Sequence, residues 1–186
     1  MRNGISWLNK QVSRPFATLN PQKSVGESRL AGWRPLRQIH GLMRIAVIAD
    51  THGHLPSRIL PDLRQADEIW HLGDVCDLST LTAVREIGPP VFAVLGNNDF
   101  GLDLPATLTL DRAGHRFFLI HIAPRILPAV EFLLHGHTHV PRDEKIGATR
   151  ILNPGTIGKA NKGAPPGFAW LTLSPEGDVT WEHVPL

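Results

Sequence analysis

Hydrophobic residues occur in short continuous runs that alternate with stretches of helical periodicity. The first run, residues 45–49, is apolar at successive positions, as in a strand buried on both faces of a parallel sheet, and two further runs follow at 68–72 and 91–95. Between them, 56–66 and 78–87 carry apolar side chains at helical spacing; Pro61 limits the first stretch and Gly88 ends the second. Because strand–helix–strand connections are right-handed and join parallel strands, this half predicts a parallel sheet.

The second half of the chain has a different pattern. Its strand-like segments follow one another with few helical stretches: 108–110, 116–120, 131–134, 167–173 and 179–184. Turn residues at 111–114 and 174–178 predict hairpins. A parallel half followed by a mixed half predicts an α/β fold of two packed sheets with helices outside.

Charge divides the chain at Met43. Residues 1–42 contain seven Lys or Arg against one Glu, whereas 43–186 contain twelve basic and sixteen acidic residues. The basic segment has no sustained periodicity, and we expect a disordered N-terminal extension followed by one domain at 43–186. Its composition resembles a transit peptide, although an upstream extension before a domain start at Met43 is the favoured interpretation.

Composition excludes several kinds of site. No run of 18 or more apolar residues occurs, so no membrane span is expected. The single cysteine, Cys76, excludes an internal disulfide framework and a metal site made of thiolates alone. A reducing compartment fits this cysteine content, and we predict a cytoplasmic protein.

Potential metal ligands follow five predicted strands. In α/β folds, functional groups gather beyond the carboxyl ends of strands. Carboxylate and amide groups follow the first three strands, and imidazoles follow the first, fourth and fifth: Asp50 and His52, Asp74, Asn97, His121, and His137 and His139. Each residue alone has an ordinary explanation as a turn, a helix cap or a packed histidine. Their joint occurrence at successive strand ends predicts a metal centre.

The ligand types favour two metal ions. Imidazole and carboxylate without thiolate suit Mn²⁺, Fe²⁺, Ni²⁺, Zn²⁺ or Mg²⁺, and we predict two divalent ions with Mn²⁺ as the first choice. Seven ligands exceed what one tetrahedral ion needs. Paired ions sit about 3.5–4 Å apart and assist in-line displacement at phosphorus.

These motifs resemble the ordered signature of the calcineurin-like metallophosphoesterases. The motifs are Asp50-x-His52, Gly73-Asp74, Gly96-Asn97-x-Asp99, His121 and Gly136-His137-x-His139. The short spacings and the segment Asn153-Pro-Gly-Thr156 resemble the small bacterial and archaeal phosphodiesterase branch. The resemblance covers residues 43–184 and implies a four-layer α/β/β/α sandwich, in which two mixed sheets are flanked by helices.

The resemblance also assigns a role to each ligand. One metal ion would be held by Asp50, His52 and His139. The other would be held by Asn97, His121 and His137, with Asp74 bridging the two ions. Asp99 would support the site from behind the ligands.

Four further residues are candidates near the reaction or beside it. Asn98 stands where many superfamily members have a histidine that contacts the scissile phosphate; an asparagine can bind phosphate but cannot act as a general acid. His54 could reach the leaving group, and Arg125 could contact phosphate. His71, inside a strand, is expected to pack beside the site. For His54 and Arg125, an exposed surface position is at least as good an interpretation.

The leading functional hypothesis is hydrolysis of small phosphodiesters by a metal-bridging hydroxide. A phosphomonoesterase and a non-catalytic protein-binding scaffold on the same fold are the alternatives. Residues 43–186 carry a net negative charge, so long nucleic acid is not an expected partner. We expect a small phosphoester substrate and no membrane, and a homo-oligomer remains open.

Overall fold

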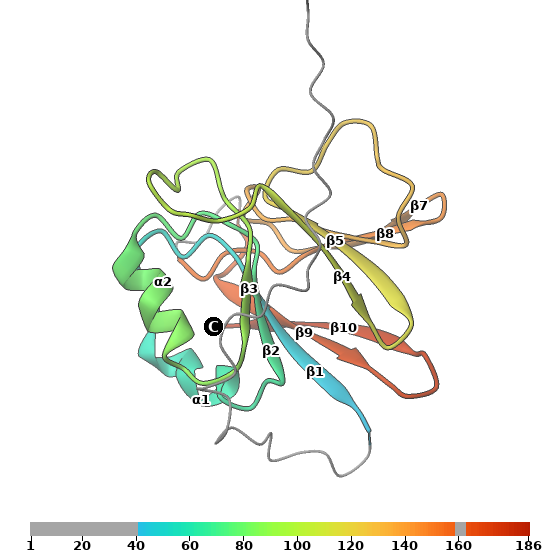
Figure 1. Ribbon diagram of the computed structural model, residues 1–186, viewed down its shortest axis with the longest axis horizontal. Coiled ribbons are helices and arrows are strands. Elements are labelled where there is room, and N and C mark those ends of the chain that lie inside the picture. The colour runs from blue at the N-terminus through green and yellow to red at the C-terminus, as the bar shows by residue number, and fades with distance from the viewer. Residues whose placement is uncertain (1–40, 159–162) are drawn as a thin grey trace, which may run out of the picture. The chain divides into compact units, whose positions relative to one another are not determined.

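Two five-stranded sheets form the body of the domain (Figure 1). The computed structural model describes residues 41–158 and 163–186, so most of the predicted N-terminal extension lies outside the described residues. The first sheet has the order β10-β9-β1-β2-β3 and the second the order β4-β5-β6-β8-β7. Both are mixed, as the family resemblance implies.

The first sheet contains the three apolar runs predicted from the sequence. Its central strands β1, β2 and β3 are parallel, and β9 and β10 are added to β1 in antiparallel pairing. The bounds are β1 Met43–Ile48, β2 Glu68–His71, β3 Val91–Ala93, β9 Gly167–Leu173 and β10 Val179–Pro185. The carboxyl ends of β1, β2 and β3 therefore meet at one edge of the sheet.

The second sheet begins with the predicted hairpin and adds a second hairpin that the sequence pattern did not indicate. Its strands are β4 Thr107–Arg112, β5 His115–Ile120, β6 Phe132–Leu134, β7 Arg142–Ile146 and β8 Thr149–Asn153. The β4–β5 turn has Ala113 and Gly114 at positive φ, which matches the right-handed twist of a hairpin. Strand β7 lacks hydrophobic alternation because it is a charged edge strand with exposed side chains.

The main core lies between the two sheets. Fourteen buried hydrophobic residues from both sheets form it, and Trp70 packs edge-on against Phe117 with ring centroids 5.3 Å apart. A second core forms between the other face of the first sheet and the helical segments, η1 Ser57–Ile59, α1 Leu60–Leu63 and α2 Leu78–Arg85. Helix α2 begins at Asp77, whose carboxylate accepts a hydrogen bond from the Thr80 amide at 2.7 Å.

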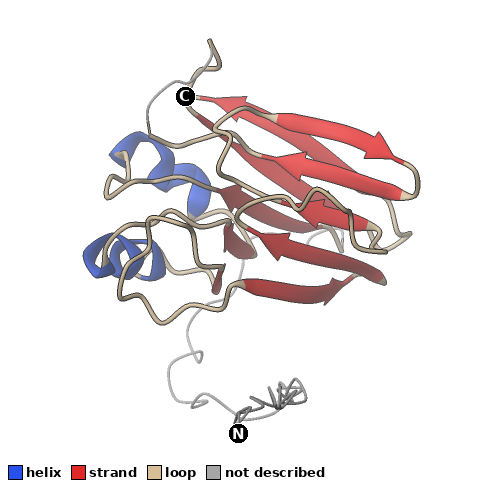
Figure 2. Ribbon diagram, turned by 90° about the horizontal axis from the view of Figure 1, so that it is seen from above, coloured by secondary structure: helices blue, strands red, loops and turns tan. Residues whose placement is uncertain are grey.

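Helices flank only one of the two sheets in the described residues. Both α-helices lie on the same side of the strands (Figures 1 and 2), so the expected helical layer over the second sheet is absent from the described part of the chain. Strands β5 and β6 are parallel, a pairing that a helix usually connects. Here residues 121–131 join them without a helix, because this connection is too short to hold one of ordinary length.

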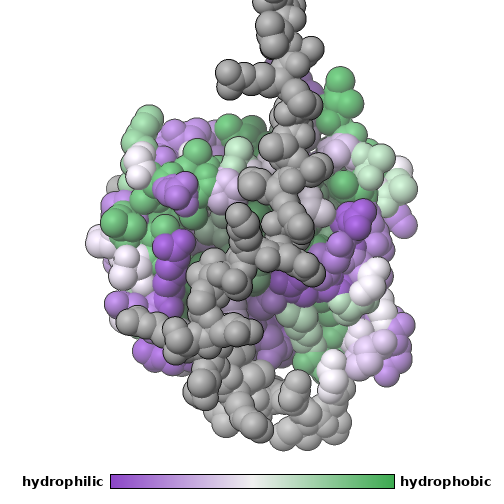
Figure 3. Space-filling model, in the orientation of Figure 1, coloured by the Kyte–Doolittle hydropathy of each residue, from purple (hydrophilic) through white to green (hydrophobic). Residues whose placement is uncertain are grey.

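The surface carries both hydrophilic and hydrophobic residues on the face visible in Figure 3. Phe100 and Ile126 are its most exposed large hydrophobic residues among those described, at 84% and 89%. No helix in residues 41–158 or 163–186 is long and apolar enough to cross a membrane.

Candidate metal centre

The loops that follow β1 and β2 are joined by backbone hydrogen bonds. The Asp50 amide donates to the Gly73 carbonyl and the His52 amide to the Asp74 carbonyl, each at 3.0 Å. A similar bond, from the Gly136 amide to the His121 carbonyl at 3.0 Å, joins the loops after β5 and β6. These pairings bring strand ends far apart in the sequence into one region.

Five predicted ligands have left-handed backbone conformations. Their φ values are +54° for Asp50, +47° for His52, +56° for Asp74, +65° for His137 and +59° for His139. Residues other than glycine rarely adopt this backbone region. Each one costs about 1–3 kcal/mol of folding free energy and persists only where the surrounding structure holds it. Strain concentrated at the ligands is typical of a functional site.

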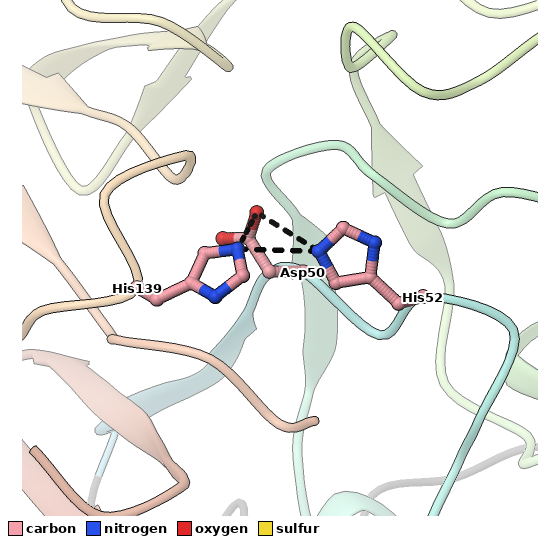
Figure 4. A group of neighbouring side chains, drawn as sticks. All are labelled: Asp50, His52 and His139. Carbon is pink, nitrogen blue, oxygen red and sulfur yellow. Dashed lines mark hydrogen bonds and ion pairs between the residues drawn. The ribbon is translucent and has the colours of Figure 1, made fainter. Parts of the chain in front are cut away.

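Asp50, His52 and His139 form a first group of converging acceptor atoms (Figure 4). His139 Nε2 lies 3.2 Å from Asp50 Oδ1 and 3.2 Å from His52 Nε2. Asp50 Oδ1 is buried and has no hydrogen-bond partner. A divalent cation among these atoms would satisfy all three, since a buried oxygen without a partner is otherwise costly.

Burial and neighbouring charge raise the pKa of Asp50 to about 8. Loss of hydration is the main cause, followed by repulsion from the Asp74 carboxylate; the hydrogen bond from the His137 amide acts in the opposite direction. Asp50 is fully buried, so its negative charge requires a cation beside it. Its environment therefore fits a metal ligand.

His121 and Asp74 belong to a second group, which Asp50 shares. His121 Nδ1 donates to the Leu72 carbonyl at 2.7 Å, which leaves the Nε2 lone pair of the neutral ring free. Nε2 lies 3.4 Å from Asp74 Oδ1 and 3.0 Å from Asn97 Oδ1. Burial lowers the pKa of His121 and keeps the ring neutral, as a metal-binding imidazole must be.

Asp74 lies between the two groups. Its Oδ2 is 3.8 Å from His52 Nε2, while its Oδ1 faces His121. Gly96 allows this position, because a Cβ there would overlap the backbone and carboxylate of Asp74. The predicted bridging position of Asp74 is consistent with these distances.

Asn98 contacts Asp74 rather than pointing away from the ligands. Its backbone amide donates to Asp74 Oδ1 at 2.9 Å and its side-chain amide to Oδ2 at 2.7 Å. Burial alone would raise the pKa of Asp74, but the Asn98 hydrogen bonds and the nearby histidines outweigh it and lower that pKa. In this arrangement Asn98 orients the Asp74 carboxylate; the predicted contact with phosphate stays a prediction.

Asp99 supports the same loop from behind. Its carboxylate accepts backbone hydrogen bonds from Asp74 at 3.0 Å, from Cys76 at 2.6 Å and from Gly96 at 2.6 Å. The side chain is 6% exposed. These hydrogen bonds fix the loop backbone around Asp74; the role behind the metal ligands that the resemblance implies stays a prediction.

The remaining predicted residues lie at the edge of the centre or outside it. The ring of His137 stands 5.2 Å from that of His121, outside both groups of converging atoms. His54 is exposed and lines a cavity beside the first group. Arg125 is exposed in the connection at 121–131, and among the described residues no hydrogen bond or ion pair joins it to the centre.

Several supporting residues were not predicted. The Thr156 hydroxyl donates to the Asp50 carbonyl at 2.9 Å, and Asn153 Nδ2 donates to the Gly136 carbonyl at 2.9 Å. Cys76 Sγ lies 3.4 Å from His52 Nδ1. Their positions depend on loops that meet only in the folded chain.

The chain belongs to the calcineurin-like phosphoesterase superfamily. It matches the model of the calcineurin-like phosphoesterase superfamily domain over residues 43–176. It is 32% identical over 134 residues to the probable metallophosphoesterase MJ0623 of Methanocaldococcus jannaschii, a match that covers 62% of this chain and 69% of that protein. It is 29% identical over 161 residues to the phosphodiesterase YfcE of Escherichia coli, a match that covers 70% of this chain and 88% of that protein. These relatives place it in the small branch found in bacteria and archaea.

Solved structures agree on the fold. The phosphoesterase YfcE of E. coli aligns with a TM-score of 0.63 at 25% identity, covering 75% of this chain and 98% of that one. Vacuolar protein sorting 29 from Cryptosporidium parvum aligns with the same TM-score at 20% identity, over 78% and 99%. The second likeness concerns the fold alone. The two mixed sheets and the metallophosphatase fold expected from the motifs are therefore confirmed, whereas the fourth layer, helices over the second sheet, is absent from the described residues.

Proposed function

We propose that this chain is a metal-dependent phosphodiesterase that hydrolyses small phosphodiesters. The observation that carries the proposal is the buried Asp50 oxygen without a partner, which faces two imidazole nitrogens beside a second group of the same kind. Membership of the superfamily and similarity to a protein named as a phosphodiesterase support the same chemistry.

The residues of the centre would hold two divalent cations. Asp50, His52 and His139 would bind one ion; His121 and Asn97, with His137 at the edge, would bind the other, and Asp74 would lie between them. The mixture of imidazole and oxygen ligands favours Mn²⁺, with Fe²⁺, Ni²⁺ and Zn²⁺ compatible. Divalent ions lower the pKa of bound water and neutralise negative charge at phosphorus.

The cavity beside the first group gives room for an ester group of the substrate. It has a volume of about 500 Å³ and is lined by Thr51, His52, His54, His139 and Gly158. This volume lies within the range of about 300–1,000 Å³ common for small-molecule sites. A phosphodiester bound at the metals would place one of its two organic groups here.

His54 is the proposed proton donor to the leaving group. Asn98 cannot supply a proton at ordinary pH, and its side chain is bound to Asp74. His54 lines the cavity from a loop that also carries two ligands. We expect His54→Asn to slow hydrolysis of a diester with an alkyl leaving group about 10²-fold and that of a dinitrophenyl ester far less. Equal losses for both esters would exclude this role.

A metal-by-substrate matrix tests the proposed function. The EDTA-treated protein would be assayed with Mn²⁺, Ni²⁺, Zn²⁺ and Mg²⁺ against bis(p-nitrophenyl) phosphate and p-nitrophenyl phosphate. We expect metal-dependent cleavage that favours the diester, its loss in His121→Ala and Asp74→Asn, and its retention in His115→Gln, which alters a histidine outside the centre. Preference for the monoester would instead indicate a phosphomonoesterase.

The second candidate function is a protein-binding scaffold. Its support is the short β5–β6 connection, which leaves the second sheet without a helix in the described residues. An inactive scaffold has no need for metal ligands, yet all seven candidate positions of this chain carry a residue that can bind a metal. Stoichiometric metal binding without hydrolysis of any phosphoester would favour the scaffold.

A further inference from the structure

His71 lies at the end of β2, between the two loops that carry three of the predicted ligands. Its side chain is fully buried. Nδ1 is 3.2 Å from the Gly73 amide nitrogen, and Nε2 is 3.1 Å from Thr51 Oγ1. Both ring nitrogens therefore have a partner, and neither partner, Thr51 or Gly73, is a proposed metal ligand.

The hydrogen-bond partners determine where the protons lie. A backbone amide can only donate, so Nδ1 accepts from Gly73 and the ring proton is on Nε2. Nε2–H then donates to Thr51 Oγ1, and the Thr51 hydroxyl is free to donate to the Asp74 carbonyl at 3.4 Å. The result is a continuous series of hydrogen bonds, in which Gly73 donates to His71, His71 to Thr51 and Thr51 to Asp74.

This series of hydrogen bonds joins the same two loops as the backbone hydrogen bonds from Asp50 to Gly73 and from His52 to Asp74. Thr51 stands between the ligands Asp50 and His52, and Gly73 precedes the ligand Asp74. All three ligands have positive φ, so their loops need restraint from the surrounding structure. His71 supplies that restraint from inside the fold, where water cannot compete for its hydrogen bonds.

We propose that His71 is a positioning residue, whose neutral ring holds Thr51 and Gly73 so that Asp50, His52 and Asp74 are arranged for divalent cations. The inference rests on the metal centre of the proposed function. The ring adds no positive charge beside the cations, since burial lowers the pKa of His71 to about 4. Residues that orient metal ligands typically contribute about 10–100-fold to metal affinity.

The test compares variants at both ends of the Nε2 hydrogen bond. Thr51→Val removes the hydroxyl and keeps the shape, Thr51→Ser restores the hydroxyl, and His71→Phe removes both ring partners. The matched control is Thr149→Val, because Thr149 is also buried and its hydroxyl donates to the Val130 carbonyl, outside the metal centre. Mn²⁺ affinity of the metal-free proteins would be measured by calorimetry, and folding by urea denaturation.

We expect Thr51→Val and His71→Phe to weaken Mn²⁺ binding at least about 10-fold. Thr51→Ser and Thr149→Val should bind Mn²⁺ as the wild type does, even where they lose stability. The double variant of Thr51→Val and His71→Phe should lose little more affinity than the weaker-binding single variant, because both changes break one chain.

Unchanged affinity in Thr51→Val would overturn the inference while leaving the metal centre intact, and this variant decides the question if His71→Phe fails to fold. Equal loss of affinity in Thr149→Val would also overturn it, since the effect would then follow stability alone. A wild-type protein that binds no Mn²⁺ would overturn the proposed function and the inference together. Binding without hydrolysis would remove only the proposed activity.

Discussion

Replacing Asp50 with Asn should stabilise the metal-free protein and weaken its response to metal. Asn removes the buried charge but keeps the shape and the oxygen that accepts the His137 amide at 3.0 Å. Its amide nitrogen could also donate to His139 Nε2, which faces Asp50 Oδ1 at 3.2 Å. Asn tolerates the left-handed backbone at this position, where φ is +54°.

The size of the effect follows from the pKa of Asp50. This pKa is about 8 in the folded chain, against an ordinary value of 3.8 for an aspartate side chain. Between these values the folded protein keeps a proton that the unfolded chain has released, so the free energy of unfolding falls as pH rises. pH 7 lies roughly three pH units above the ordinary pKa of Asp. The free energy of unfolding falls by about 1.36 kcal/mol for each of these units, so the loss at pH 7 is about 4 kcal/mol. Below pH 4 the two proteins should differ little.

Urea denaturation of EDTA-treated wild type and Asp50→Asn at pH 4.5, 6 and 7.5 measures this difference. The gap between the two midpoints should widen with pH in favour of Asp50→Asn. Adding Mn²⁺ should raise the midpoint of the wild type more than that of the variant, which keeps the residues proposed for the second ion, because ligands that bind the folded state stabilise it. A gap that does not change with pH, or a variant less stable than the wild type at pH 7.5, would refute the reasoning.

Three further predictions concern residues around the centre. Gly96→Ala should cost about 3 kcal/mol and most of the metal affinity, because its Cβ would overlap Asp74; denaturation and calorimetry measure both. Asp99→Asn should weaken Mn²⁺ binding and reduce stability by about 1–3 kcal/mol, since one carboxylate accepts three amides, and a fully retained affinity would contradict this. His115→Gln should be destabilising mainly at low pH. Both His115 nitrogens face acceptors, the Glu131 carboxylate at 2.9 Å and the Gly177 carbonyl at 2.7 Å. The hydrogen bond to Glu131 raises the His115 pKa most, and the hydrogen bond to Gly177 raises it further. The stabilisation should be complete below pH 6.5 and disappear as pH rises through the folded pKa, which denaturation midpoints from pH 5.5 to 9 can follow.

Much of the fold was predictable because it depends on patterns with fixed periods. Continuous apolar runs with helical stretches between them specified the parallel core of the first sheet, and turn residues specified the β4–β5 and β9–β10 hairpins. The pattern missed the β7–β8 hairpin, because an exposed edge strand such as Arg142–Ile146 needs no hydrophobic alternation. It also predicted helices over both sheets, although the short 121–131 connection leaves no room for one.

The sequence by itself determined the identity and order of the candidate ligands. Carboxylate and imidazole groups follow successive buried strands, and parallel strands bring their carboxyl ends to one edge, so their meeting could be expected before any coordinates existed. Only the tertiary structure decided how they meet. Atom distances of 3–4 Å depend on left-handed loop residues, and the pKa of Asp50 depends on burial, neither of which a one-dimensional pattern contains. Only the tertiary structure shows the hydrogen bonds from Asn98 to Asp74 and from His71 to Thr51. Each of them joins loops more than 19 residues apart in the chain.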